Sequence, residues 1–348
     1  MPVPAHAWVP GPTYAGAGWV VDRMRSDTEL RVVVTGGAGF IGSWVCELLL
    51  RRGAQVVCVD NFATGSPANV EHLASNRAFR LVEADVSEGL DVDGPVDWVL
   101  HLACPASPVD YLRIPLDTLK VGSRGTWNAL DLAERHRARL VLASTSEVYG
   151  DPLEHPQRET YWGNVNPIGP RSVYDESKRF SEALTAAYRR ERGVDTAIVR
   201  IFNTYGPRMR AHDGRAVPAF MTQALAGEPL TVAGDGSQTR SLCFVTDTVE
   251  GILAMAASDV SGPVNLGSGD EVTMRALAER ICDLAGSDSA VRPIDLPVDD
   301  PKRRRPDTTL ARRVLGWQPR VGLDEGLSRT LEWFRLEQQP VSAGAARG

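Results

Sequence analysis

The sequence contains only five cysteines, an odd number, and they are widely scattered: Cys46, Cys58, Cys104, Cys243 and Cys282. The first two fall within apolar stretches that are expected to form core elements. The six histidines show no metal-ligand spacing either. We therefore expect buried, reduced thiols rather than disulfides or metal ligands, and a cytoplasmic protein that holds no metal.

Long apolar runs and an excess of positive charge are also lacking. No uninterrupted apolar segment approaches the ~18 residues needed to cross a bilayer, and no basic start followed by an apolar core marks a secretory signal. The formal net charge of −6 argues against a general nucleic-acid binder. These absences predict a globular protein with no membrane and no nucleic acid among its partners.

Composition divides the 348 residues into four parts. Residues 1–29, rich in Pro, Gly and Ala, predict a flexible N-terminal extension. Residues 30–205 alternate strand-like and helix-like stretches, which is typical of a nucleotide-binding domain. Pro and Gly increase after residue 205, so residues 206–337 predict a smaller α/β lobe that completes a cleft. Residues 338–348 predict a flexible tail.

The alternation of short aliphatic runs with helical periodicity predicts a Rossmann-type α/β fold, with a doubly wound parallel sheet. Strands are expected at 32–34, 55–59, 79–86, 96–103, 138–146, 196–202 and, in the smaller lobe, 230–233. Helices are expected from residue 40 to Gly53 and at 117–136, 172–192, 216–226, 246–257 and 273–285.

A glycine-rich turn joins the first strand to the first helix. Gly36, Gly39 and Gly42 follow the G-x-x-G-x-x-G spacing, which lets a pyrophosphate approach backbone amides and a helix N-terminus. The next strand ends in Asp60, where an acid can accept hydrogen bonds from the adenine ribose hydroxyls and repel a 2′-phosphate. This combination predicts a dinucleotide site that prefers NAD to NADP.

Tyr174 and Lys178 form a second signal. They lie at i and i+4 of the helix expected at 172–192, with Ser172 as its N-cap. The apolar stripe of this helix, Phe180 to Tyr188, is centred more than 90° from the pair, so we expect the pair to face away from the main packing surface. A nearby ammonium and a positive nicotinamide favour a phenolate, which predicts a tyrosine base.

A third signal stands at the end of a predicted central strand. Thr145, Ser146 and Glu147 follow one another where open α/β sheets bind ligands. Thr145 is expected to hydrogen-bond the hydroxyl that loses a hydride, and Glu147 to present a carboxylate beside the substrate.

Five longer motifs accompany these residues: His101–Pro108, Tyr161–Arg171, Arg200–Met209, Gly236–Arg240 and Asp299–Asp307. Together they resemble the extended short-chain dehydrogenase/reductase superfamily, and within it the UDP-glucuronate decarboxylase (UDP-xylose synthase) family, over about residues 31–335. Two departures are Cys104, where the family usually has Ser, and Ala63, in place of an aromatic residue.

The resemblance implies a reaction and its residues. Tyr174 takes the proton from the sugar O4 while NAD⁺ takes hydride from C4; the ketone then lies β to the C6 carboxylate, CO₂ leaves, and the hydride returns to give UDP-xylose. Thr145 and Lys178 are assigned to the proton relay, and Ser146, Glu147 and Arg304 to the surroundings of the carboxylate and ring. The implied NAD contacts are Gly36, Gly39, Phe40, Ile41, Gly42, Asp60, Asn61, Thr64, Gly65, Asp85, Val86, Leu102, Ala103, Tyr174 and Lys178.

The implied UDP-sugar contacts lie further along the chain. Arg215 and Arg240 are candidates for the diphosphate, because guanidinium groups pair well with phosphate oxygens. Of the basic run Lys302–Arg305 we assign only Arg304 to the site and leave its neighbours on the surface. The remaining positions matched to substrate are Lys120, Asn128 and Asn203. Relatives pair through the helices near 117–136 and 172–192, which implies a homodimer.

Other activities stay open at this point. A 4,6-dehydratase needs a general acid after the threonine, where this chain has Ser146, and 4-epimerases generally lack the glutamate. A decarboxylase that releases some UDP-4-keto-xylose is a variant within the same fold. A non-catalytic NAD-sensing regulator is a different class, and it commonly loses the tyrosine or the lysine that are both present here.

Overall fold

A computed structural model of the protein describes residues 30–296 and 303–337. The extension predicted for residues 1–29, the tail predicted for 338–348 and the start of the last motif lie outside the described residues. None of the described helices combines the length and apolar character needed to cross a membrane.

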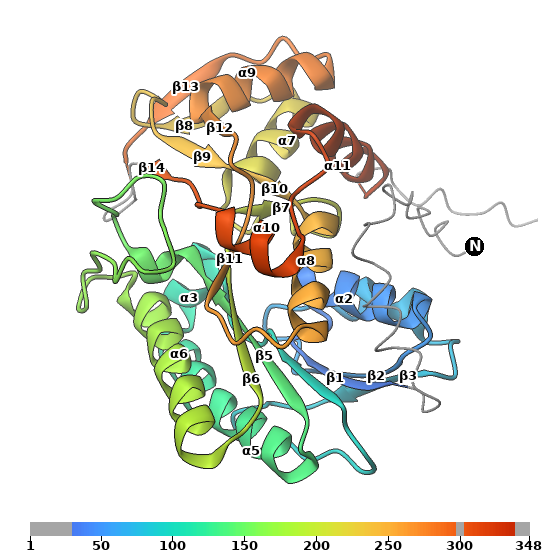
Figure 1. Cartoon of the computed structure of the whole chain (residues 1–348). Helices are drawn as coiled ribbons and strands as arrows, with labels where there is room; N and C mark the ends of the chain where they lie inside the picture. The colour runs from blue at the N-terminus through green and yellow to red at the C-terminus, as the bar shows by residue number, and fades with distance from the viewer. Residues whose placement is uncertain (1–29, 297–302, 338–348) are drawn as a thin grey trace, which may run out of the picture.

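A seven-stranded sheet forms the centre of the larger lobe (Figure 1), and all its neighbouring strands run parallel. The strand order is β11-β6-β5-β4-β1-β2-β3, so the direction of winding reverses beside β1, where such sheets bind ligands at their carboxyl ends. The strands are β1 (Arg31–Thr35), β2 (Gln55–Asp60), β3 (Phe79–Glu83), β4 (Trp98–His101), β5 (Arg139–Thr145), β6 (Thr196–Ile201) and β11 (Val264–Leu266).

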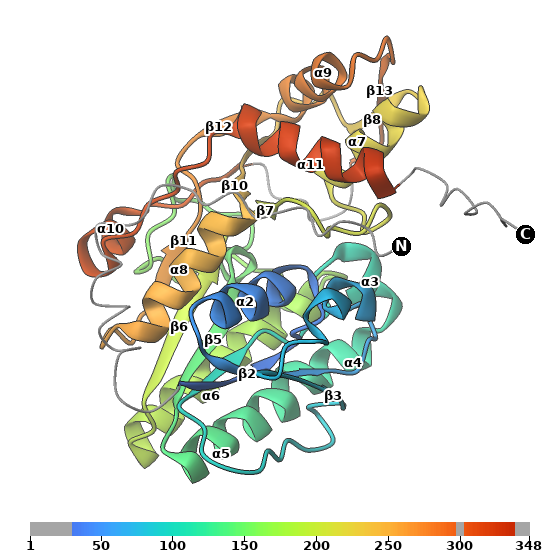
Figure 2. The same ribbon diagram turned by 90° about the vertical axis from the view of Figure 1, so that its right-hand side faces the viewer.

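Helices cover both faces of this sheet, which explains why its central strands β4 and β5 are buried at every residue. In β1, Val32 and Val34 belong to one core cluster while Val33 belongs to the other. Figure 2 shows α2 and α8 on one side of the sheet and α5 and α6 on the other. The helices are α2 (Phe40–Arg51), α3 (Pro108–Arg113), α4 (Pro115–Lys120), α5 (Thr126–His136), α6 (Ser172–Arg192), α7 (Ala216–Ala226), α8 (Val245–Ala257), α9 (Met274–Ala285), α10 (Thr309–Leu315) and α11 (Leu323–Glu337).

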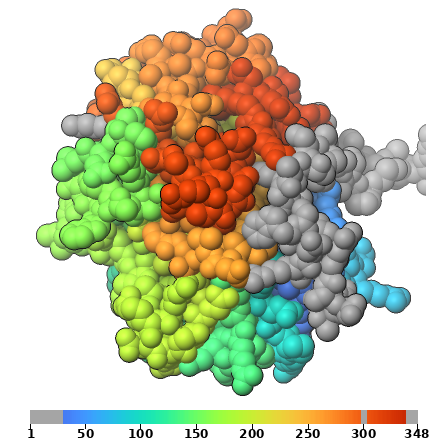
Figure 3. All heavy atoms as spheres, in the orientation of Figure 1, coloured from blue at the N-terminus to red at the C-terminus, as the bar shows by residue number. Residues whose placement is uncertain are grey.

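The smaller lobe consists of short strand pairs and a three-stranded sheet, with α7, α9 and α11 packed around them (Figure 2). The lobes interleave, because α8 and β11 return from it to the large sheet. Figure 3 shows the residues around α10 (red) between the loop near residue 160 (green) and α8 (orange). The remaining strands are β7 (Thr204–Tyr205), β8 (Leu230–Ala233), β9 (Thr239–Ser241), β10 (Cys243–Phe244), β12 (Glu271–Thr273), β13 (Val291–Ile294) and β14 (Arg303–Arg304).

The Rossmann-type α/β fold is confirmed, and so are the predicted strands, several of which are shorter at their ends. The helix predicted at 117–136 is interrupted by a π turn at Val121–Gly125. A Cβ on Gly122 would lie 2.5 Å from the Cβ of Ser177 on α6. Glycine at this turn therefore allows the close approach of α6, which helical periodicity alone does not reveal. The five cysteines are free thiols, as expected.

Candidate active site

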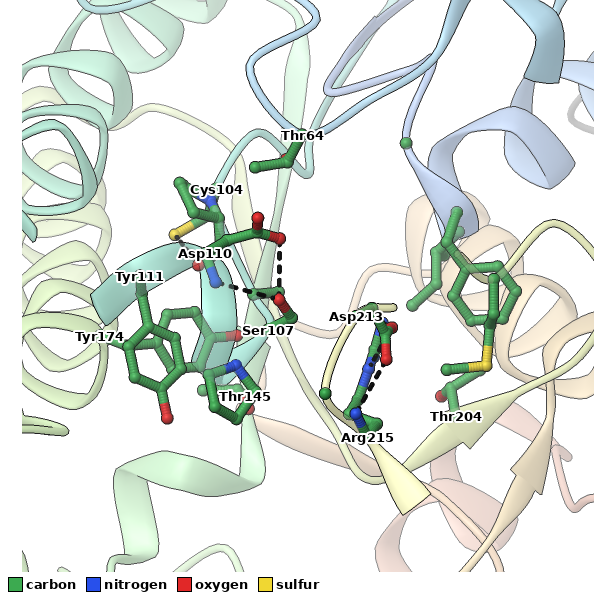
Figure 4. A pocket seen from close by; sticks show the side chains of 18 of the residues that line it. Thr64, Cys104, Ser107, Asp110, Tyr111, Thr145, Tyr174, Thr204, Asp213 and Arg215 are labelled. Atoms are coloured by element: carbon green, nitrogen blue, oxygen red, sulfur yellow. Dashed lines mark hydrogen bonds and ion pairs between the residues drawn. The ribbon is translucent and has the colours of Figure 1, made fainter. Parts of the chain in front are cut away.

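A cavity of about 570 Å³ lies between the two lobes, at the carboxyl ends of the central strands. Figure 4 shows side chains from both lobes around it, with Tyr111, Thr145 and Tyr174 on one side and Arg215 with Asp213 facing them. Its wall includes all fifteen positions expected to contact NAD, from Gly36 to Lys178. Residues far apart in the sequence thus share one cavity.

The glycine turn fits a dinucleotide pyrophosphate. Gly36 adopts a positive φ of 69°, and a Cβ on Gly42 would lie 2.1 Å from the Gly36 carbonyl oxygen. The N-cap of α2 is Gly39, which has no side chain to occupy the first amides of the helix. These amides and the positive end of the helix dipole stay available to an anion.

Asp60 lies at the end of β2, where the adenine ribose of a dinucleotide binds. Its carboxylate accepts hydrogen bonds from the backbone amides of Ala38 and Phe62, each at 2.9 Å. Burial raises the pKa of Asp60, and these amides oppose the rise. A Cβ on Gly65 would lie 2.9 Å from both carboxylate oxygens. Glycine at position 65 therefore lets the following loop close over Asp60.

Tyr174 and Lys178 lie together on the buried face of α6. The Lys178 ammonium donates to the Ala143 carbonyl oxygen at 2.8 Å and lies 6.0 Å from the centre of the Tyr174 ring. The ring of Tyr111 stacks on that of Tyr174 with 5.3 Å between centroids (Figure 4). The phenol is therefore held between an aromatic ring and the end of β5.

Two expectations about this helix need correction. Only part of the predicted apolar stripe is buried, since Tyr188 is 4% exposed and Phe180 is 46% exposed. The buried face of the helix also carries the Tyr174/Lys178 pair and small polar residues. Ser181, for example, donates to the Gly122 carbonyl oxygen at 2.7 Å, so polar groups are satisfied by backbone where the helix approaches closely. The N-cap is Arg171 rather than Ser172, and no side chain caps the helix.

The ammonium alone does not lower the pKa of Tyr174. Burial raises that pKa well above 10, and a hydrogen bond with Thr145 only partly opposes the rise. The protein's own groups therefore do not produce the lowered pKa of Tyr174 that the sequence predicts, because desolvation of a buried phenolate outweighs their effect.

Glu147 and Arg304 meet at the other end of the catalytic segment. Glu147 follows β5 in a short 3₁₀ turn, Ser146–Tyr149, and accepts hydrogen bonds from both terminal nitrogens of Arg304 and, at 2.7 Å, from Arg171. Although burial raises the pKa of Glu147, the two guanidiniums outweigh it and lower the pKa to about 2. The Nε of Arg304 is buried without a hydrogen-bond partner. Two guanidiniums surround the single carboxylate of Glu147 at the cavity wall.

The residues expected to bind substrate separate into two groups. Asn203, Arg215 and Arg240 line the cavity, and Arg215 is oriented by hydrogen bonds of 2.8 and 2.5 Å to Asp213 (Figure 4). Lys120 and Asn128 are not among the residues that line it.

Both excluded residues have other partners. Lys120 forms an ion pair with Glu88, and the Asn128 amide donates to the Val86 carbonyl oxygen at 2.7 Å. Their expected contact with substrate is therefore not supported by the structure. Among the described residues, no group of three or more His, Cys, Asp or Glu side chains could hold a metal ion.

Comparison with known proteins places the chain in a family. Residues 33–330 match the family described as GDP-mannose 4,6 dehydratase. UDP-glucuronic acid decarboxylase 1 from Arabidopsis thaliana is 51% identical over 307 residues, which cover 88% of this chain and 70% of that protein. The chain belongs to the UDP-glucuronic acid decarboxylase family.

Two solved structures relate this decarboxylase family member to its wider superfamily. The UDP-glucuronic acid 4-epimerase of Bacillus cereus, in complex with UDP-glucuronic acid and NAD, is 26% identical, with a TM-score of 0.79 over 88% of this chain and 100% of that one. The dTDP-glucose 4,6-dehydratase of Streptomyces venezuelae, with NAD bound, is 30% identical, with a TM-score of 0.80 over 88% and 97% of the two chains.

Sequence reasoning missed two residues of this decarboxylase-family site. Arg171 binds Glu147, and the arginine directly before α6 was the available signal. Tyr111 stacks on Tyr174, and its hydroxyl is buried without a partner. No spacing rule in the sequence connects Tyr111 with a residue 63 positions later, since α3 must first fold against α6.

Proposed function

We propose that this protein decarboxylates UDP-glucuronate to UDP-xylose, with NAD reduced and reoxidised within each turnover. The observation that carries the proposal is the Glu147–Arg304 pair in the same cavity as Tyr174. The guanidiniums of Arg304 and Arg171 in the cavity wall suit a uronate carboxylate, and the phenol of Tyr174 suits the neighbouring sugar hydroxyl. Bound NAD supplies a reversible two-electron acceptor for carbon 4. The UDP-glucuronic acid decarboxylases to which the chain is similar are named for this substrate.

The residues act on protons and charge around the sugar. Tyr174 takes the proton from O4 and later returns it, Thr145 orients that hydroxyl, and Lys178 supplies the chain's own positive charge beside the phenol. Oxidation at carbon 4 creates a ketone β to the carboxylate. The electron pair of the C5–C6 bond then forms an enolate as CO₂ leaves, and protonation at C5 gives the 4-keto pentose.

The residue after Thr145 favours decarboxylation over dehydration. Ser146 is buried and has no carboxyl group to protonate a departing hydroxyl, and the carboxyl group of Glu147 is held ionised by two arginines. Elimination of the C6 hydroxyl therefore lacks an acid at this place.

In this proposal the two lobes bind different ligands. Residues 30–205 bind NAD, and residues 206–337 mainly bind the sugar nucleotide, with Arg215 and Arg240 at the diphosphate. This assignment is supported by the position of Arg215 and Arg240, which belong to the smaller lobe and line the cavity.

A homodimer and a cytoplasmic location belong to the same proposal. Large apolar side chains are exposed on α3 to α6: Leu112, Leu116, Leu119, Trp127 and Phe180. Such a face suits a second copy of the chain. The five free thiols suit a reducing compartment.

The deciding experiment is incubation of the purified protein with UDP-glucuronate, followed by mass analysis of the nucleotide sugars. UDP-xylose formed without net NADH supports the proposal. UDP-galacturonate with its carboxylate retained would identify an epimerase instead, and unchanged substrate with bound NAD would identify a non-catalytic protein. UDP-4-keto-xylose in the product, with and without added NADH, measures early release.

A further inference from the structure

A buried asparagine on β11, Asn265, joins three segments that are far apart in the sequence. It is fully buried and is not among the residues that line the cavity. Its side-chain oxygen accepts a hydrogen bond of 2.8 Å from the Tyr149 hydroxyl. Its Nδ2 donates to two backbone carbonyl oxygens, that of Gln157 at 3.0 Å and that of Asp307 at 3.2 Å.

The hydrogen bonds around Asn265 fit one orientation of its amide. The Arg200 guanidinium can only donate, and it binds the Tyr149 hydroxyl at 2.9 Å. This hydroxyl therefore gives its own hydrogen to Oδ1 of Asn265. The two carbonyl oxygens on the other side can only accept, so they face Nδ2. A buried polar network in which each group has its partner holds its members rigidly.

Gln157 ties down the segment that carries Arg304. The Gln157 amide donates to the Arg305 carbonyl oxygen at 2.9 Å, and its side-chain Oε1 accepts from the Arg305 amide at 2.8 Å. The Asp307 amide donates to the Gln157 carbonyl oxygen at 2.8 Å. Like Asn265, Gln157 is fully buried and does not line the cavity. The backbone directly after Arg304 is therefore held by a buried partner.

The same network reaches Glu147 from the other direction. Tyr149 is the last residue of the 3₁₀ turn that also contains Glu147, and its hydroxyl binds Asn265. Asn265 thus contacts both the turn that carries Glu147 and the segment that carries Arg304. A displacement of about 1 Å in a binding group can cost about 100-fold in rate. The geometry of the ion pair therefore depends on how its two backbones are held.

We propose that Asn265 and Gln157 are positioning residues for the Glu147–Arg304 pair, and that through this pair they determine the preference of the cavity for a sugar nucleotide with a carboxylate at C6. Neither residue lines the cavity, so their effect passes through Arg304. The inference rests on one part of the proposed function, the uronate carboxylate beside this arginine. A neutral sugar nucleotide such as UDP-glucose has a hydroxymethyl group at C6 and does not use that contact.

The test compares affinities for UDP-glucuronate and UDP-glucose, which differ only at C6, by titration calorimetry of the NAD-loaded protein. All variants carry Tyr174→Phe, so that neither ligand is consumed. Gln157→Met keeps the length of the side chain but removes the acceptor for the Arg305 amide. We expect Gln157→Met and Asn265→Leu to weaken binding of UDP-glucuronate by about 10-fold and to leave that of UDP-glucose unchanged. Gln157→Glu keeps an oxygen for the amide and should recover most of the preference.

Gln223→Met is the matched control. Gln223 also accepts from a backbone amide, but its partner is Thr231 in the smaller lobe, at 3.0 Å. This variant should leave the ratio of the two affinities unchanged. A second comparison starts from Arg304→Gln, because residues that act through Arg304 add little once this arginine is gone. In that variant, Asn265→Leu and Gln157→Met should not weaken binding of UDP-glucuronate further.

The outcomes separate the inference from the proposed function. Equal weakening of both ligands by Gln157→Met and Asn265→Leu would assign these residues a general structural role and overturn the inference. Unchanged affinity for UDP-glucuronate in Gln157→Met would overturn it too, and this variant decides alone if Asn265→Leu does not fold. If the variants lose the preference but the protein with Tyr174 intact releases no CO₂, the inference stands and the proposed function fails.

Discussion

Arg304 binds both carboxylate oxygens of Glu147, a residue 157 positions earlier in the chain. Arg304 comes from β14, which pairs with β9 in the smaller lobe, and Glu147 follows the central strand β5 of the large sheet. The pair therefore joins the two lobes at the cavity, and each residue depends on the other to be buried as an ion.

Replacement of Arg304 should affect both the reaction and the fold. We expect Arg304→Gln to lower kcat/KM for UDP-glucuronate by at least ~100-fold, because the carboxylates of both substrate and Glu147 lose a charged partner. Arg304→Lys keeps the charge but cannot bind two oxygens side by side, so it should recover only part of the rate. Steady-state kinetics and thermal unfolding of both variants provide the measurement. Full activity in Arg304→Gln would remove this arginine from the site.

Tyr174 is expected to carry the proton transfer at O4. Tyr174→Phe should lose ~10²–10⁴-fold in turnover while NAD stays bound, since the ring still stacks on Tyr111. Tyr111→Phe is the matched control, because it removes one hydroxyl from the other ring of the stack and should lose much less. Turnover and NAD content after purification are to be measured together. Activity that survives Tyr174→Phe would contradict the proton relay.

The elements of the fold were predictable because their signals are local. The strands of the buried sheet are continuous apolar runs, and the glycine turn is one contiguous motif. The packing face of α6 was not predictable in this way. Its buried residues include Ser177 and Ser181, whose polarity suggests solvent exposure, but which are satisfied by nearby backbone carbonyls. Helical periodicity in a sequence shows only which side chains are apolar. It does not show which polar side chains find backbone carbonyls to bind in the folded protein.

The site residues were predictable where a motif or the family likeness marked them. They were less predictable where the position of a side chain depends on its contacts in the folded chain. Glu147 and Arg304 were both assigned before their pairing was known. Lys120 and Asn128 were assigned by position alone, and each has a partner outside the cavity lining, Glu88 and the Val86 carbonyl. Which partner a long polar side chain reaches depends on neighbouring loops, and their placement requires the folded chain.

Asp60 should set the choice of dinucleotide. Asp60→Asn keeps one side-chain oxygen, which can accept from the amide of either Ala38 or Phe62 but not from both, and it removes the negative charge. We expect it to weaken NAD binding by ~10-fold, since hydrogen bonds to charged groups contribute about 1.5–3 kcal/mol, and to narrow the preference over NADP. Titration of both dinucleotides provides the measurement. An unchanged ratio of the affinities for NAD and NADP would show that Asp60 does not distinguish a ribose hydroxyl from a 2′-phosphate.

Glu47 should make the fold sensitive to acid. It is buried on α2; burial raises the pKa of Glu47, but His72 and Arg208 outweigh it and lower that pKa from 4.5 to about 2. A depressed pKa in the folded state means that the stabilisation is present above pH 4.5 and is lost as the pH falls towards 2. The lowered pKa corresponds to a contribution by Glu47 to the free energy of unfolding on the order of 3 kcal/mol.

Glu47→Gln should therefore be less stable than the unaltered protein at neutral pH and should lose less stability between pH 5 and pH 3. Urea unfolding at the two pH values measures both effects. Glu71→Gln, an exposed acid in the neighbouring short helix, is the control and should leave the pH dependence unchanged. If Glu47→Gln and the unaltered protein lose equal stability on acidification, the ionised Glu47 does not control how the free energy of unfolding changes with pH.

The apolar face on α3 to α6 predicts how two copies associate. Trp127 and Phe180 are each 46% exposed and lie on adjacent helices. A charge placed among apolar side chains is costly to bury, so Trp127→Glu and Phe180→Glu should convert a dimer into a monomer in sedimentation velocity. Trp162→Glu changes a side chain that is 89% exposed on the loop before α6, outside the two proposed helices, and should leave the dimer intact. A monomeric unaltered protein, or dissociation by Trp162→Glu alone, would move the interface away from α5 and α6.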